Sequence, residues 1–108
     1  MKEYAVCLDD SAIDGLVEIF VSLWEFLGSE ESARAYIDQL EAFCFKLDLS
    51  PYRGTKRDDL YPGLYVTHYR SNIRIGYFVN DEKAEVRVIL IEAVKKNLSP
   101  EIMLEKLS

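Results

Sequence analysis

Hydrophobic residues follow two different spacings along this chain, and the changes of spacing divide it into segments. In residues 3–8 the larger side chains Tyr4, Val6 and Leu8 alternate with the smaller Ala5 and Cys7, which predicts a short strand. Residues 11–28 and 29–48 carry apolar side chains at the three- and four-residue spacing of helices. The apolar face predicted for the first helix consists of Ile13, Leu16, Val17, Phe20, Leu23, Trp24 and Leu27, widened by Ile19 and Phe26. The face predicted for the second helix consists of Ala33, Tyr36, Ile37, Leu40, Phe43, Cys44 and Leu47.

Small and polar residues mark the ends of these two helices. Ser11, followed three residues later by Asp14, resembles a capping box and predicts where the first helix starts. Gly28 is placed to end that helix, and Ser29 to cap the start of the second. Because the connection is so short, the two helices are expected to pair antiparallel.

The second half of the chain reads as strands. Pro51 ends the second helix, because proline also forces the residue before it out of helical geometry. After a turn at Pro62-Gly63, residues 64–69 and 73–79 alternate across a short polar connection, as in a β-hairpin. A third strand follows residues 80–83, and its continuous apolar run Val88–Ile91 predicts a central strand covered on both faces.

A last helix is predicted over residues 99–107. Ser99 and Pro100 stand in the order expected of a cap and a first helical position. The element order is therefore β-α-α-β-β-β-α, an α+β fold in which a two-helix hairpin packs on one face of a mainly antiparallel sheet. The first strand is expected at an edge of the later meander or beside its last strand.

Length and composition favour a single globular domain over residues 1–108. No apolar run approaches the roughly 20 residues of a membrane span, and the N-terminus has no secretory signal pattern, so a cytoplasmic protein is expected. Cys7 and Cys44 stand in apolar contexts and are expected to be reduced core residues. One histidine, His68, and two separated cysteines form no metal-ligand cluster, and no Gly-rich phosphate loop occurs, so neither a metal nor a cofactor is expected.

The formal net charge of −6 is unevenly distributed. Residues 1–50 carry three Lys/Arg and eleven Asp/Glu, whereas residues 51–75 carry five and two. An acidic chain is a poor general binder of nucleic acid, because neutralisation of phosphates drives such binding. The local basic segment still allows contact with an anionic group, although it also fits an ordinary solvated loop.

The basic segment carries a family resemblance. It contains Pro51, Arg53, Gly54, Arg57, Asp58, Asp59, Leu60, Pro62, Gly63 and Leu64, followed by a strand and by Ile75-Gly76-Tyr77-Phe78-Val79. This ordered set resembles the RelE/ParE toxin superfamily, and its ParE branch of plasmid-stabilisation proteins more closely. The predicted order of elements agrees with that superfamily over residues 3–92.

The resemblance implies the toxin of a type II toxin–antitoxin module, neutralised by a cognate antitoxin. The ParE branch implies binding to a macromolecular target, with DNA gyrase as the leading one, and no reaction by the toxin itself. The RelE branch implies a metal-independent mRNA endonuclease built from sheet-face cations and a late Tyr or His. After Phe78 this chain has no aromatic residue and no histidine, which speaks against the second implication. A third alternative is a non-toxic protein that only binds the antitoxin.

Two groups of residues are candidates for contacts with other molecules. The cations predicted to meet the target are Arg53, Lys56, Arg57, Arg74 and Arg87, with Lys95 and Lys96 just past the last strand. The apolar residues predicted to meet a partner such as the antitoxin are Trp24, Phe26, Met103, Leu104 and Leu107. The last helix can instead cover the chain's own sheet. His68 is expected to have a structural or surface role, with a role in a functional site as the alternative.

A first prediction concerns the basic segment. If Arg53 and Arg57 contact the target, replacing both with Ala should abolish toxicity, because the segment is the most basic part of an acidic chain. Folding should be intact, as judged by circular dichroism. Full toxicity of the folded double variant would contradict the assignment.

Overall fold

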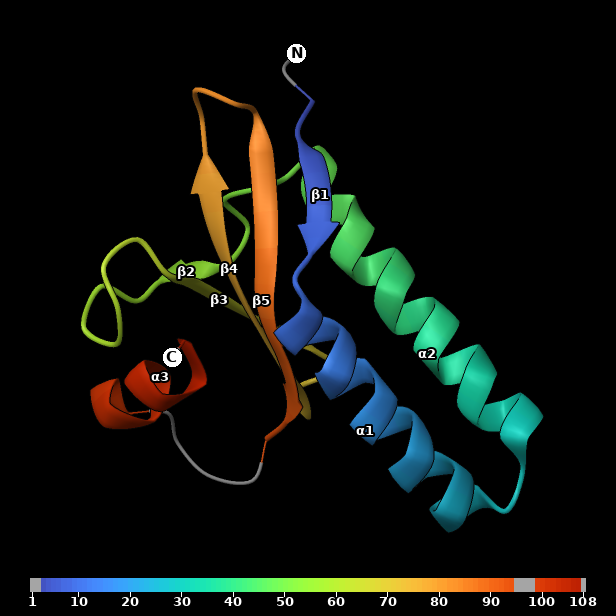
Figure 1. The fold of residues 1–108 in the computed structure, drawn as a ribbon. Helices are drawn as coiled ribbons and strands as arrows, with labels where there is room; N and C mark the ends of the chain where they lie inside the picture. Colours follow the sequence, from blue (N-terminus) through green and yellow to red (C-terminus); the bar gives the residue numbers. More distant parts are fainter. Residues whose placement is uncertain (1–2, 95–98, 108) are drawn as a thin grey trace.

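The computed structural model describes residues 3–94 and 99–107 and has a mixed α+β fold (Figure 1). In chain order the elements are β1 (Ala5–Leu8), α1 (Asp10–Leu27), α2 (Glu30–Phe45), a 3-10 turn η1 (Lys46–Asp48), β2 (Thr55–Lys56), β3 (Tyr65–Tyr69), β4 (Ile73–Asn80), β5 (Glu85–Ala93) and α3 (Pro100–Leu107). The predicted order is confirmed, with β2 as an addition inside the predicted basic loop. Lys95 and Lys96 lie outside the described residues.

The five strands form one sheet in the order β1-β5-β4-β3-β2. β1 pairs parallel to β5, and every other neighbouring pair is antiparallel. The first strand therefore lies both at an edge and beside the last strand, which resolves the two predicted alternatives. Figure 1 shows α1 and α2 as an antiparallel hairpin on one face of this sheet and α3 on the other.

Strand β5 is covered on both faces, as its apolar run predicts. Gly76 of β4 is opposite Leu90, but the next residue, Tyr77, is opposite Val88, so Ile89 is an extra residue in β5. Such a bulge turns two successive side chains to the same face. Val88 and Ile91 consequently join the core under the helical hairpin, whereas Ile89 and Leu90 face α3.

Helix α1 packs directly on β5. The Ser11 hydroxyl donates to the Ile89 carbonyl at 2.7 Å. A Cβ added to Gly15, one turn later, would lie 1.9 Å from the Ile91 carbonyl oxygen. Only glycine allows this approach of helix to strand. The predicted capping box at Ser11 is therefore wrong: α1 begins one residue earlier, Asp9 precedes it without a side-chain cap, and Ser11 bonds the sheet instead.

The predicted apolar face of α1 is only partly buried. Leu16 and Ile19 lie in the core, but Ile13, Val17 and Leu27 are exposed. Apolar residues occupy more than half of the circumference of α1, and their spacing alone does not say which edge of so broad an arc meets the sheet. The contact of Ser11 and Gly15 with β5 sets the rotation and turns the other edge outward.

Helix α2 follows its predicted pattern closely. Gly28 ends α1 with φ of 68°, in the left-handed region that favours glycine, and the Ser29 hydroxyl accepts from the Ser32 amide at 3.2 Å. Leu40 and Cys44 are fully buried in the core. The helix ends at Phe45, and η1 carries the last predicted helical residue, Leu47, into the same core.

Helix α3 covers the second face of the sheet. Ser99 caps it as predicted, since its hydroxyl accepts from the Ile102 amide at 3.2 Å. Met103 is fully buried against that face, in a cluster with Leu60, Leu64, Val66, Ile89 and Leu90, and Leu107 is partly buried there. Of the two alternatives for this helix, covering the chain's own sheet is the one observed.

The prediction that both cysteines are core residues holds for Cys44 and is wrong for Cys7, which is exposed. Val6 and Leu8 on the same strand pack toward the helical hairpin, so alternation turns Cys7 to the opposite face. Burial raises the pKa of the Cys44 thiol to about 12, which keeps it protonated and unreactive.

A second prediction tests the contact between α1 and β5. Gly15→Ala should destabilise the protein by about 2 kcal/mol, because the added methyl group meets backbone rather than a side chain that can move. The melting temperature should fall by roughly 10 °C for a domain of this size. Asp14→Ala, at the exposed neighbouring position, is the control and should change the melting temperature little. Equal melting temperatures of the two variants would contradict the close approach.

Candidate functional site

The basic loop between η1 and β3 is fixed to the sheet rather than loosely attached. The Gly54 amide donates to the Tyr77 hydroxyl at 3.0 Å, and the Arg57 amide donates to the Leu64 carbonyl at 2.7 Å. The Tyr52 and Tyr4 hydroxyls both donate to the Asp81 carboxylate in the β4–β5 turn. The loop thus presents its cations from a defined backbone.

Both cations that follow Gly54 already meet acids of the same loop. Arg57 donates two hydrogen bonds to Asp59, at 2.9 and 2.8 Å, and Lys56 Nζ lies 3.9 Å from Asp58. The hydrogen bonds from Arg57 hold the pKa of Asp59 below its ordinary range, so Asp59 is ionised at neutral pH. Because these pairs are exposed to water they contribute little to stability, so an incoming anionic group can replace them.

Arg53 is placed differently from these two. Its guanidinium lies 4.6 Å from the centre of the Phe43 ring on α2, a cation–π arrangement at the surface. It therefore presents its charge beside the helical hairpin, whereas Lys56 and Arg57 lie at the β2 edge of the sheet.

The two strand arginines share the sheet face that α3 covers, but they lie at opposite ends of it. Arg87 is opposite Phe78 at one end and pairs with Asp9, its Nε 3.3 Å from Oδ2. Arg74 is opposite Glu92 at the other end, 7% exposed, with Nε 3.5 Å from Oε1. The five predicted target-binding cations therefore form no single patch.

Sequence reasoning missed a row of polar residues on this face. His68, Arg74 and Glu92 stand directly opposite one another on β3, β4 and β5. His68 is exposed, and Glu92 is partly exposed. Only the strand register brings these residues together, and the sequence does not state the register. The row combines an imidazole, a guanidinium and a carboxylate, which are the groups that acid–base chemistry at a phosphate uses.

The predicted partner-binding residues fall into two classes. Trp24 and Leu104 are exposed, and Phe26 is 86% exposed, the largest value among the large apolar side chains of the described residues. Met103 and Leu107 instead pack on the chain's own sheet. These two are open to a partner only if α3 leaves the sheet.

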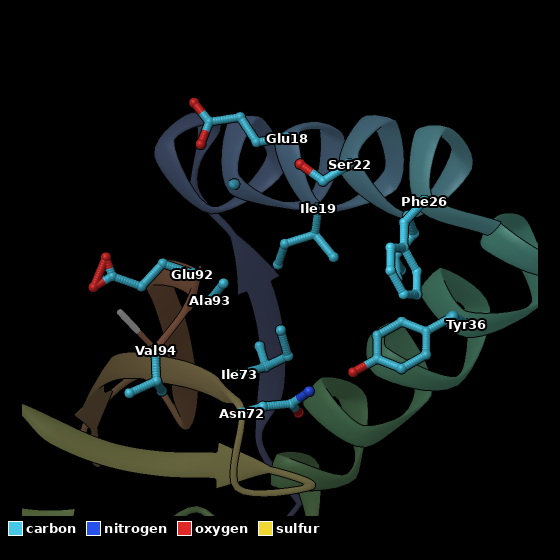
Figure 2. A pocket seen from close by; sticks show the side chains of 12 residues that line it. Glu18, Ile19, Ser22, Phe26, Tyr36, Asn72, Ile73, Glu92, Ala93 and Val94 are labelled. Atoms are coloured by element: carbon cyan, nitrogen blue, oxygen red, sulfur yellow. The ribbon is translucent and has the colours of Figure 1, made fainter. Parts of the chain in front are cut away.

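Phe26 stands at a groove of about 650 Å³ between α1 and the end of the sheet. Figure 2 shows its ring beside Tyr36, with Ile19 and Ile73 on the inner wall and the carboxylates of Glu18 and Glu92 toward the other end. Gly15, where α1 contacts β5, also lines this groove.

The described residues include no group of three His, Cys, Asp or Glu side chains that could hold a metal ion. Among the helices that the structure describes, none has both the length and the hydropathy needed to cross a bilayer. The chemistry available at these surfaces is therefore that of cations, carboxylates, one imidazole and exposed apolar side chains.

Comparison with known proteins shows the fold. No protein-family profile matches the sequence, and no curated protein matches it. Among solved structures, the chromosomal ParDE toxin–antitoxin system of P. aeruginosa matches at a TM-score of 0.72 and 18% identity, over 86% of this chain and 98% of that chain. The RelBE2 toxin–antitoxin complex of Mycobacterium tuberculosis matches at 0.61 and 18%, over 85% and 99%.

A third solved structure is a double arginine-to-alanine mutant of the E. coli toxin RelE in the free state, which matches at a TM-score of 0.63 and 21% identity, over 97% of this chain and 95% of that chain. The chain thus has the RelE/ParE toxin fold, as the resemblance of its basic segment implies. Identities this low show the fold alone.

A third prediction concerns the tyrosines that hold the basic loop. Hydrogen bonds to Asp81 raise the pKa of Tyr52 and of Tyr4 above the ordinary value of about 10. The stabilisation is thus fully present below pH 10 and is lost as the pH rises through the pKa of the folded state. Chemical denaturation of the wild type should show stability falling above pH 10, and the fall should be shallower in Tyr4→Phe/Tyr52→Phe.

The control for this pH series is Tyr61→Phe, since Tyr61 packs against Phe78 on the sheet face that α3 covers. It should keep the profile of the wild type. Parallel profiles of the wild type and the double variant would show that the cluster does not carry the alkaline dependence.

Proposed function

We propose that this chain is the toxin of a type II toxin–antitoxin module of the ParE kind, which inhibits growth by binding a protein target and is neutralised by a cognate antitoxin. DNA gyrase is the leading target. The fold shared with ParE and RelE toxins supports the class, together with the basic segment whose residues resemble the ParE branch.

The observation that favours a protein target over RNA is the pairing of the cations. Arg57, Arg74 and Arg87 are each within ion-pair distance of an acid of the same chain, and the chain as a whole is acidic. A ribonuclease that tracks RNA needs cations aligned along the phosphate backbone. Separate ion pairs at opposite ends of a sheet suit local contacts with a protein instead.

One observation favours a second function, a metal-independent endoribonuclease. In the row on β3, β4 and β5, His68 and Glu92 could act as base and acid while Arg74 faces the phosphate. One group would take the proton of the ribose 2′-hydroxyl, the 2′-oxygen would bond to phosphorus, and the 5′-oxygen would leave with a proton from the other group. Arg74 is nearly buried, so this function requires the site to open.

A fourth prediction separates these functions. In cells induced to express the chain alone, DNA synthesis followed by pulse labelling should stop before protein synthesis. The purified chain should inhibit supercoiling by gyrase, and the product of a short neighbouring antitoxin gene should restore both activities. Arg53→Ala/Arg57→Ala should lose these effects, whereas Lys46→Ala/Lys83→Ala, which removes two exposed charges elsewhere, should retain them.

Two results would contradict the gyrase proposal. If protein synthesis stops first and message cleavage disappears in His68→Ala/Glu92→Gln, the ribonuclease is the function. If neither synthesis changes while folded protein accumulates, the chain is not an active toxin in that host, and binding of the antitoxin is what it retains.

A further inference from the structure

The helical hairpin of α1 and α2 is strongly acidic. From Asp10 to Phe45 the chain has eight Asp/Glu and one Lys/Arg. That one cation, Arg34, pairs with Glu30 at 2.9 Å and lies 5.2 Å from the centre of the Phe20 ring. The hairpin therefore presents carboxylates with almost no compensating charge of its own.

An exposed apolar stripe runs along the same hairpin. Ile13, Val17, Val21 and Trp24 are 45%, 55%, 44% and 44% exposed and follow one another at spacings of four, four and three residues. They therefore share one face of α1. The eleven residue-to-residue steps from Ile13 to Trp24 give this stripe a length of about 16 Å, which matches three turns of another helix. A contiguous row of exposed apolar side chains is a common feature of interaction sites.

The stripe borders a groove between the two helices. The groove has a volume of about 320 Å³, and Ile13, Val17 and Phe20 line it from α1, with Ile37 from α2. Asp38 and Glu41 of α2 also line it, together with Arg34, whose charge is paired with Glu30. On the other side of the stripe Asp14 precedes Val17 by three residues and Glu25 follows Val21 by four, so both lie next to it on α1. The stripe thus runs between two rows of carboxylates.

We propose that this stripe is the docking site for a cationic amphipathic helix of a partner protein. Such a helix would place apolar side chains at three- and four-residue spacing on the stripe and Lys or Arg on both flanks, opposite the two carboxylate rows. In the proposed toxin this helix belongs to the antitoxin, and in naming that partner the inference rests on the proposed function.

The charge around the stripe favours a cationic helix over the other molecules that could bind an apolar surface. A second copy of the chain would bring the same carboxylates against Asp14 and Glu25, and like charges across an interface cost binding energy. Anionic lipid and nucleic acid would be repelled for the same reason. A cationic helix satisfies both the apolar stripe and its flanks.

A fifth prediction tests the site with the purified full-length chain. The probe is a synthetic 18-residue helical peptide with Leu at three- and four-residue spacing and Lys elsewhere, and its matched control has Glu in place of every Lys. Calorimetry should show binding of the Lys peptide that weakens with salt, and no binding of the Glu peptide. Val17→Asn/Val21→Asn should weaken binding at least about tenfold, because two exposed apolar contacts are lost.

Charge variants separate the site from general attraction to an acidic protein. Asp38→Asn/Glu41→Gln should weaken binding several-fold and flatten its salt dependence. Glu101→Gln/Glu105→Gln, which removes the same charge from α3 on the opposite face, should bind like the wild type. Leu49→Asn, at an exposed apolar residue outside the stripe, should also bind like the wild type.

Three results would overturn the proposal. The first is equal binding of the two peptides, and the second is equal weakening by the α3 and α2 charge variants. The third is self-association of the chain that Val17→Asn/Val21→Asn abolishes in sedimentation, which would make a second copy the occupant. None of these binding measurements depends on toxicity. The docking site can therefore be refuted without refuting the toxin function, and the toxin function can be refuted without refuting the docking site.

Discussion

The close contact between α1 and β5 is the constraint on which the rest of the structure depends. Gly15 lets the helix reach the Ile91 carbonyl, and Ser11 bonds the Ile89 carbonyl one turn earlier. β5 also holds β1 on one edge and β4 on the other, so the helical hairpin, the parallel edge strand and the antiparallel meander all meet at one strand. A change at this contact therefore moves the helices relative to the sheet.

The bulge at Ile89 extends the same strand to the second face. Without the extra residue, Ile89 and Leu90 would point to opposite faces. With it, both meet Met103, and α3 has an apolar surface on which to pack. Gly76 contributes as well, since a Cβ there would lie 3.1 Å from the Leu90 Cβ. One irregularity in β5 and one glycine opposite it thus make a place for the last helix.

The sequence predicts what depends on local spacing and fails where long-range geometry decides. The order of elements, the Ser29 and Ser99 caps and the double coverage of Val88–Ile91 all follow from residues near one another in the chain. The bulge does not. Residues 88–91 are all apolar, so there is no alternation of polar and apolar residues that an extra residue would interrupt. The row of His68, Arg74 and Glu92 was missed for the same reason, since it exists only in the register.

The exposed edge of α1 is the clearest case of such a failure. A helix with apolar residues around more than half of its circumference is expected to be deeply buried, but Ile13 and Val17 are exposed. Nothing local shows that Ser11 and Gly15, rather than the large apolar side chains of the first two turns, face the sheet. The broad apolar arc of α1 therefore contains two surfaces, one that packs on β5 and one that is open to solvent.

The distribution of charge separates two kinds of contact in space. The cations Lys56 and Arg57 lie at the β2 edge, at the opposite end of the strand order from β1 and β5, where α1 packs. A cationic helix seated on the α1 stripe would leave that edge uncovered, because a stripe about 16 Å long does not span five strands about 4.8 Å apart. If the target binds at the basic loop, such a partner could block it only with a further segment that crosses the sheet. The alternative is a target that itself requires the hairpin surface, in which case partner and target compete for the stripe directly.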